Sequence, residues 1–169
     1  MHFPTKRHIA ANALLSCVGI LLGYVESLLV PDLFLPGMKL GISNIVILYA
    51  VIKMRKRDAV CIGLIKTVVN GLAFSGLMSC FYSVSGVLFS FLAMNILKKF
   101  YPKFLSCTGI SVAGSALFNI GQITAAIVVL KTVAPVYYLG YYLLLSVLTG
   151  IVTGVVTEII INKGVVKIN

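Results

Sequence analysis

Long apolar runs follow one another along this chain, and only short clusters of charged residues, proline and glycine interrupt them. A run of about 20 residues, rising about 1.5 Å per residue, is long enough for a helix to cross a hydrocarbon core of about 30 Å. We expect helices because lipid offers no hydrogen-bonding partner to an unpaired backbone group. Placing a break at each interruption predicts six membrane-spanning helices, at residues 9–30, 38–52, 59–79, 82–97, 104–130 and 135–161.

The weakest of these breaks separates the third predicted helix from the fourth. It rests on the stretch SCFYS (79–83), which contains neither charge nor proline. The second and fourth helices are also short, and a short helix is accommodated by a small tilt, by a thinner bilayer or by packing behind its neighbours. The pattern as a whole predicts an all-α fold in which the 169 residues form a single transmembrane bundle.

The composition points to the same class of protein. Hydrophobic residues make up 60% of the chain and charged residues 11%, and the mean hydropathy is +1.08. These values are far outside the range of soluble domains. We therefore expect a multi-pass protein of the cell membrane.

The charged residues indicate how the bundle is oriented. The 14 basic and four acidic residues give a net charge of +10, and lysine and arginine accumulate in short cytoplasmic loops. Placing both termini in the cytoplasm puts most of the basic residues on that side. Topology and anionic lipid then account for the charge, and no nucleic-acid partner is expected. The basic residues on this side are Lys6, Arg7, Lys53, Arg55, Lys56, Arg57, Lys98, Lys99, Lys103, Lys163 and Lys167.

Residue patterns for catalysis or metal binding are missing from the sequence. The four cysteines lack the paired spacing of a disulfide framework or a zinc site. The four acidic residues are far apart, so no aspartate cluster can hold magnesium against a diphosphate. No glycine-rich loop precedes a Lys-Ser or Lys-Thr pair to bind a nucleotide. We expect neither an enzyme nor a metal or other cofactor.

Polar residues inside the predicted helices are the remaining candidates, because they are costly in lipid and usually functional there. Glu26, near the end of the first helix, and Lys39, at the start of the second, fall at a similar depth. They could form an ion pair that clamps the loop, or they could bind a ligand, and the sequence leaves both open. The predicted outward-facing binding site comprises Glu26, Lys39, Asn44, Asn119, Gln122 and Tyr138.

Several of these residues have a structural alternative. Tyr138 belongs to a group of tyrosines that fits an aromatic belt at the membrane interface, and Asn119 and Gln122 fit hydrogen bonds between helices. Lys66 and Asn70 share a face of the third helix. Because Lys66 is near enough to the cytoplasmic end to snorkel, we interpret it as structural.

A stripe of small residues, Ala10, Ala13 and Cys17, lies on the first helix, rotated by about 120° from its polar face. Small side chains allow another helix to approach closely. The stripe is therefore a candidate contact for a partner helix, with ordinary packing or lipid contact as the alternative.

Four stretches of the chain resemble a known family. They are YVESLLVPDLFLPGMKLGISNIVILYA (24–50), YSVSGVLFSFLAMNILKK (82–99), GSALFNIGQI (114–123) and a last helix rich in glycine and threonine. Together they resemble the Gx transporter family, also labelled heptaprenyl diphosphate synthase component I. That family is similar to the substrate-binding S components of energy-coupling factor transporters.

This resemblance implies a six-helix subunit that captures a small molecule from outside the cell. It also implies two kinds of partner, a transmembrane coupling subunit that contacts Ala10, Ala13 and Cys17, and a pair of cytosolic ATPases. Pro36 and Gly37 would shape a loop over the pocket. The family's second label implies an alternative, a membrane accessory to isoprenoid synthesis whose basic cytoplasmic loops dock a soluble prenyl synthase.

Overall fold

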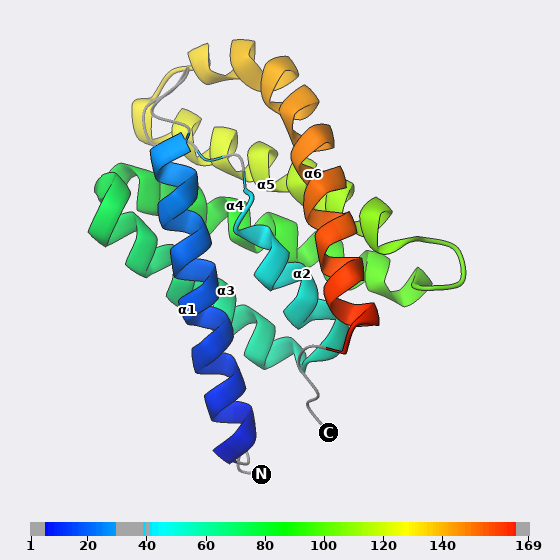
Figure 1. The fold of residues 1–169 in the computed structure, drawn as a ribbon. Helices are drawn as coiled ribbons and strands as arrows, with labels where there is room; N and C mark the ends of the chain where they lie inside the picture. The colour runs from blue at the N-terminus through cyan, green and yellow to red at the C-terminus, as the bar shows by residue number, and fades with distance from the viewer. Residues whose placement is uncertain (1–5, 30–38, 40, 165–169) are drawn as a thin grey trace.

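The computed structural model describes residues 6–29, 39 and 41–164, and within these residues every regular element is helical. The all-α prediction is therefore confirmed, while Pro36 and Gly37 lie outside the described residues. In chain order the elements are α1 (Lys6–Leu29), α2 (Asn44–Lys53), α3 (Lys56–Asn70), the π-helical η1 (Gly71–Ser75), α4 (Gly76–Leu97), the 3-10 segment η2 (Lys98–Phe100), α5 (Cys107–Leu130), the 3-10 segment η3 (Ala134–Tyr138) and α6 (Leu139–Asn162) (Figure 1).

Four apolar helical stretches of the described chain are long enough to cross a membrane, as a multi-pass membrane protein requires. They are Ile9–Leu28, with 20 residues, Lys56–Phe100, with 45, Cys107–Leu130, with 24, and Ala134–Asn162, with 29. Large apolar side chains project outward from them, which suits a surface in contact with lipid. Leu21, Leu77, Leu92 and Leu144, for example, are each at least 64% exposed. The count of six spans stays a prediction.

The 45-residue stretch is folded back on itself and is not one rod. Residues nine positions apart in an unbroken helix are separated by about 13.5 Å, yet a Cβ on Gly71 would lie 2.5 Å from the Cβ of Cys80. The reversal takes place at Gly76, whose φ of +82° favours glycine. The chain therefore turns ahead of the predicted break at 79–83, because a positive φ, and not a polar cluster, makes the turn.

Helix α2 is short and enclosed by the bundle. Its ten residues rise by about 15 Å, about half of a hydrocarbon core. Ile47 and Leu48 are completely buried, and α1, α3, α4 and α6 all contact the helix. Where the sequence predicts one helix over 38–52, the described residues instead show non-helical backbone at 41–43 followed by this half-length helix.

Small residues bring α4, α5 and α6 into close contact. A Cβ on Gly121 would lie 2.9 Å from the Cα of Gly86, and a Cβ on Gly150 would lie 2.5 Å from the Cα of Val112. The Ser85 hydroxyl donates a hydrogen bond to the carbonyl oxygen of Gly121 at 2.9 Å. Backbone approach of this kind is typical of helix packing in membranes, and it fixes α4 and α5 as one wall of the bundle.

We expect Gly121→Ala to lower the thermal unfolding midpoint of the protein purified in detergent. The added methyl group meets the backbone of α4, so the two helices have to separate, and overpacking of this kind costs about 1–3 kcal/mol. Gly140→Ala is the matched control, because nothing lies within 4 Å of a Cβ at that position. Equal midpoints for the two variants would contradict the close approach of α4 and α5.

Candidate functional site

Glu26, near the end of α1, turns its carboxylate toward the chain that leads into α2. The backbone N–H of Gly41 donates to Oε1 at 2.5 Å, and the N–H of Ser43 donates to Oε2 at 3.4 Å. The Glu26 side chain is 1% exposed, and hydrogen bonds to an ionised acceptor offset part of the cost of such burial. Among the described residues, Glu26 forms no ion pair with Lys39. It holds the loop through backbone groups instead.

Gln122 of α5 holds the same loop from another side. Its buried side-chain amide faces the backbone of Lys39. With the amide oriented to suit these neighbours, its nitrogen donates to the Lys39 carbonyl oxygen at 3.1 Å and its oxygen accepts from the Lys39 N–H at 3.2 Å. We refer to Lys39 and residues 41–43 as the entry loop of α2. Side chains from α1 and α5 thus fix the position of this loop.

Lys66 of α3 lies beneath the entry loop, with its side chain 2% exposed. Its Nζ donates to the Ser43 hydroxyl at 2.8 Å and to Oδ1 of Asn44 at 3.3 Å. Its methylene groups pack on the middle of α1, where a Cβ on Gly19 would lie 3.1 Å from Lys66 Cδ. The expectation that Lys66 snorkels to the membrane surface is therefore wrong. Its ammonium group is directed inward, toward polar partners at the start of α2.

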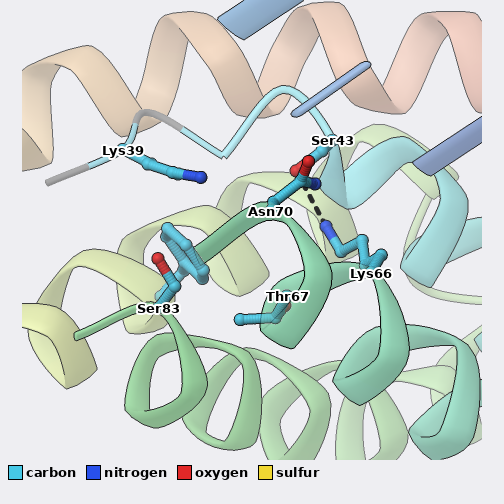
Figure 2. Close-up of a pocket in the computed structure, with 7 residues that line it drawn as sticks. Lys39, Ser43, Lys66, Thr67, Asn70 and Ser83 are labelled. Atoms are coloured by element: carbon cyan, nitrogen blue, oxygen red, sulfur yellow. Dashed lines mark hydrogen bonds between the residues drawn. The ribbon is translucent and has the colours of Figure 1, made fainter. Parts of the chain in front are cut away.

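A small polar cavity separates Lys66 from Lys39 (Figure 2). Its volume of about 10 Å³ is roughly the space that one water molecule needs. Two polar atoms that line the cavity, Asn70 Oδ1 and Ser83 Oγ, have no hydrogen-bond partner in the described structure. Each of these residues is only 3% exposed. The lining residues are Lys39, Ser43, Lys66, Thr67, Asn70, Ser83 and Phe118.

Unpaired buried polar atoms are unusual, because each costs about 1–3 kcal/mol unless it finds a partner. Figure 2 shows the Lys39 side chain extending from the entry loop, with its nitrogen pointing toward Ser43 and Asn70. The cavity therefore gathers hydrogen-bonding groups from the entry loop, α3 and α4 at a single point. This arrangement is suited to holding a small polar group.

The residues predicted from the sequence divide between this cavity and other places. Asn44 contacts Lys66, as described above, whereas Asn119 donates to the carbonyl oxygen of Tyr142 at 2.8 Å and so links α5 to α6. Tyr138 lies in η3, is exposed and does not line the cavity. Ligand contacts by Asn119 and Tyr138 stay predictions.

The stripe predicted for a partner helix is accessible in the structure. Ala10, Ala13 and Cys17 are all exposed on α1. The side of α1 that carries Gly19 and Gly23 instead packs against α3. The stripe is therefore accessible to a partner, and a partner-binding role stays a prediction.

Sequence reasoning missed Lys66, Asn70 and Ser83 as parts of the site, although a signal for two of them was present. A Cβ on Gly19 would meet Lys66, and a Cβ on Gly23 would lie 2.1 Å from Nδ2 of Asn70. Two glycines four residues apart on α1 thus face two polar residues four residues apart on α3. When glycines on one helix and polar residues on another have the same spacing, the glycines leave space for the polar side chains, and the two helices pack together there.

The groups gathered at the site are lysine, hydroxyl and amide side chains, which can form hydrogen bonds and carry positive charge. Within the described ranges no group of three or more His, Cys, Asp or Glu side chains is placed to hold a metal ion. The charged groups at the cavity and its loop are Lys39, Lys66 and the carboxylate of Glu26, and neutral hydroxyl and amide groups surround them.

A comparison with protein-family models identifies the family. The model described as heptaprenyl diphosphate synthase component I matches residues 15–160. The chain belongs to this family. The match confirms the resemblance noted in the sequence, since the heptaprenyl diphosphate synthase component I family is the one also labelled Gx transporter. No curated protein and no solved structure matches the chain.

We expect Glu26→Gln to loosen the entry loop of this family member. Glutamine keeps one acceptor oxygen and presents an N–H₂ group to the second backbone N–H, so one hydrogen bond to a charged group, worth about 1.5–3 kcal/mol, is lost. Amide hydrogen exchange at Gly41 and Ser43 should then accelerate about tenfold or more. Glu158→Gln on α6 is the control, and equal exchange in both variants would show that Glu26 does not hold the loop.

Proposed function

We propose that this protein is the membrane-embedded substrate-binding subunit of an energy-coupling factor type uptake transporter. The observation that carries the proposal is the cavity between Lys39 and Lys66, which places two lysines and several neutral polar groups at one point within a membrane bundle. Ionisable residues within membrane bundles usually mark a pathway or binding site for a solute. Under this proposal the site holds the substrate, and the residues predicted from sequence to contact it are Glu26, Lys39, Asn44, Asn119, Gln122 and Tyr138.

Two further features support an uptake subunit that depends on partners. The chain lacks a nucleotide-binding motif, so transport driven by ATP would need separate ATPase subunits. The exposed small residues of α1 offer a surface for a transmembrane coupling subunit. We propose six spans with both termini in the cytoplasm, which agrees with α1 beginning and α6 ending at the same end of the molecule (Figure 1).

A mild-detergent pull-down of the tagged protein from its native membranes tests this function. We expect a membrane coupling subunit and two ATPases among the proteins identified by mass spectrometry. Ala13→Leu should reduce their recovery severalfold, because a larger side chain prevents close helix approach. Ala73→Leu, at another exposed alanine, is the matched control. Recovery of no ATPase with the unmodified protein would contradict the transport role.

The family description favours a second candidate, a membrane accessory to prenyl diphosphate synthesis. Under this function, the exposed residues Arg55, Lys56 and Arg57 at the start of α3 would dock a soluble synthase. Replacing all three with glutamine should then release the synthase from membranes, measured by its distribution between membrane and soluble fractions. A synthase that stays on membranes lacking this protein would exclude the second candidate.

A further inference from the structure

The charges around the polar cavity do not balance. Lys39 and Lys66 both line it, and the acidic groups whose fields act on them among the described residues are Glu26, which acts on both, and the thiol of Cys80, which acts on Lys39. The Glu26 carboxylate is also turned toward the backbone N–H groups of Gly41 and Ser43. The Lys66 ammonium consequently has only neutral oxygen atoms as its hydrogen-bond acceptors.

The start of α2 adds to this positive charge. Ser43 is the N-cap residue of the ten-residue helix, and it lies on the cavity wall. The N-terminus of a helix carries a partial positive charge, so it disfavours the Lys66 ammonium group bonded there. In membrane transporters, half-length helices that begin inside the bundle direct this end toward anionic groups of the substrate. Helix α2 has that length and that enclosed position.

Buried groups without partners supply an independent indication that a ligand binds here. Asn70 Oδ1 and Ser83 Oγ line the cavity, and Nδ2 of Asn44 lies at the start of α2; all three atoms lack a hydrogen-bond partner in the described structure. The Ser83 hydroxyl and the amide nitrogen of Asn44 are both donors. Of the two unpaired atoms at the cavity itself, Asn70 Oδ1 is an acceptor and the Ser83 hydroxyl is a donor, and this donor beside two lysines matches an oxygen atom of an anion.

We propose that the substrate carries an anionic oxygen group, a carboxylate or a phosphate, which binds between Lys66 and Lys39 at the N-terminus of α2. The Ser83 hydroxyl, which lines the cavity, donates a hydrogen bond to one oxygen atom of this group. This inference rests on the proposed function, because it names the substrate class of the same site. Since the cavity has room for about one water molecule, the Lys39 side chain has to move aside to admit the group. Lys39 lies outside the helices and is only half-buried. Its side chain can therefore move more readily than those of the other lining residues.

The experiment measures the thermal unfolding midpoint of the protein purified in a neutral detergent, with inorganic phosphate, diphosphate or acetate added at constant ionic strength set by chloride. We expect at least one of these anions to raise the midpoint saturably, by about 3 °C or more. Lys39→Gln should abolish the rise, since a neutral side chain no longer attracts the anion. A midpoint that no anion raises above the chloride control would overturn the inference.

Matched variants separate a specific site from general charge effects. Lys131→Gln, at an exposed lysine after α5, should retain the full rise, and loss of the rise in this variant would overturn the inference. Lys66→Gln tests the second anchor and should also abolish the rise. The Lys66 side chain also donates hydrogen bonds to Ser43 and Asn44, so the Lys66→Gln variant can fail to fold. The Lys39→Gln variant then decides the test.

A second arm identifies the source of the anion. The midpoint is compared in nanodiscs of phosphatidylcholine and of phosphatidylglycerol, without added anion. A rise in phosphatidylglycerol that requires Lys39, with none from soluble anions in detergent, would overturn the inference that the substrate carries the anion and would assign the site to a lipid headgroup instead. That result would count against the uptake function. Anion binding without recovery of ATPases in the pull-down would likewise retain this inference while removing the transport role.

Discussion

The structure depends on supplying hydrogen-bond partners to the amino group of Lys66, which is buried in the interior of a membrane bundle. A charge in such a place is tolerated only where hydrogen-bonding groups surround it. Ser43 and Asn44 meet this requirement, and they reach Lys66 because residues 41–43 are not helical and lie within the bundle. That loop in turn needs partners for its own backbone, which Glu26 and Gln122 provide. The buried lysine, the half-length helix and the two side chains that hold the loop therefore form one interdependent arrangement.

Much of the fold could be predicted from the sequence, because lipid restricts a spanning chain to a few forms. Apolar length predicted an all-α membrane protein, which the structure confirms. Glu26 and Gln122 contact the entry loop, but the substrate-binding role expected of the polar residues stays a prediction. The turn at Gly76 was missed because one residue with a positive φ makes it, and no change in polarity marks it. The half-length of α2 was missed because apolar residues continue on both sides of its start, and hydropathy does not separate a buried loop from a helix.

Lys66 shows why a candidate site cannot be completed from periodicity alone. Its distance from the end of α3 allowed snorkelling, and the outcome depended on which residues of other helices face it. Gly19 leaves room for its methylene groups and Ser43 accepts from its ammonium group. Both are distant in sequence, and they are brought together only by the packing of α1 and α2 on α3. Membership of the heptaprenyl diphosphate synthase component I family adds no information on this point, since a family name does not place side chains.

One face of α1 packs against α3, and another is exposed. The helix therefore connects the exposed surface to the cavity. Gly19 and Gly23 seat it directly against Lys66 and Asn70, with no side chain between to absorb movement, while Ala10, Ala13 and Cys17 remain accessible on its surface. Near its far end, Glu26 grips the entry loop. Because α1 contacts both the cavity residues and the entry loop, a shift of the whole helix would change both sets of contacts together. A protein that docks on α1 would thereby act on the cavity without touching it.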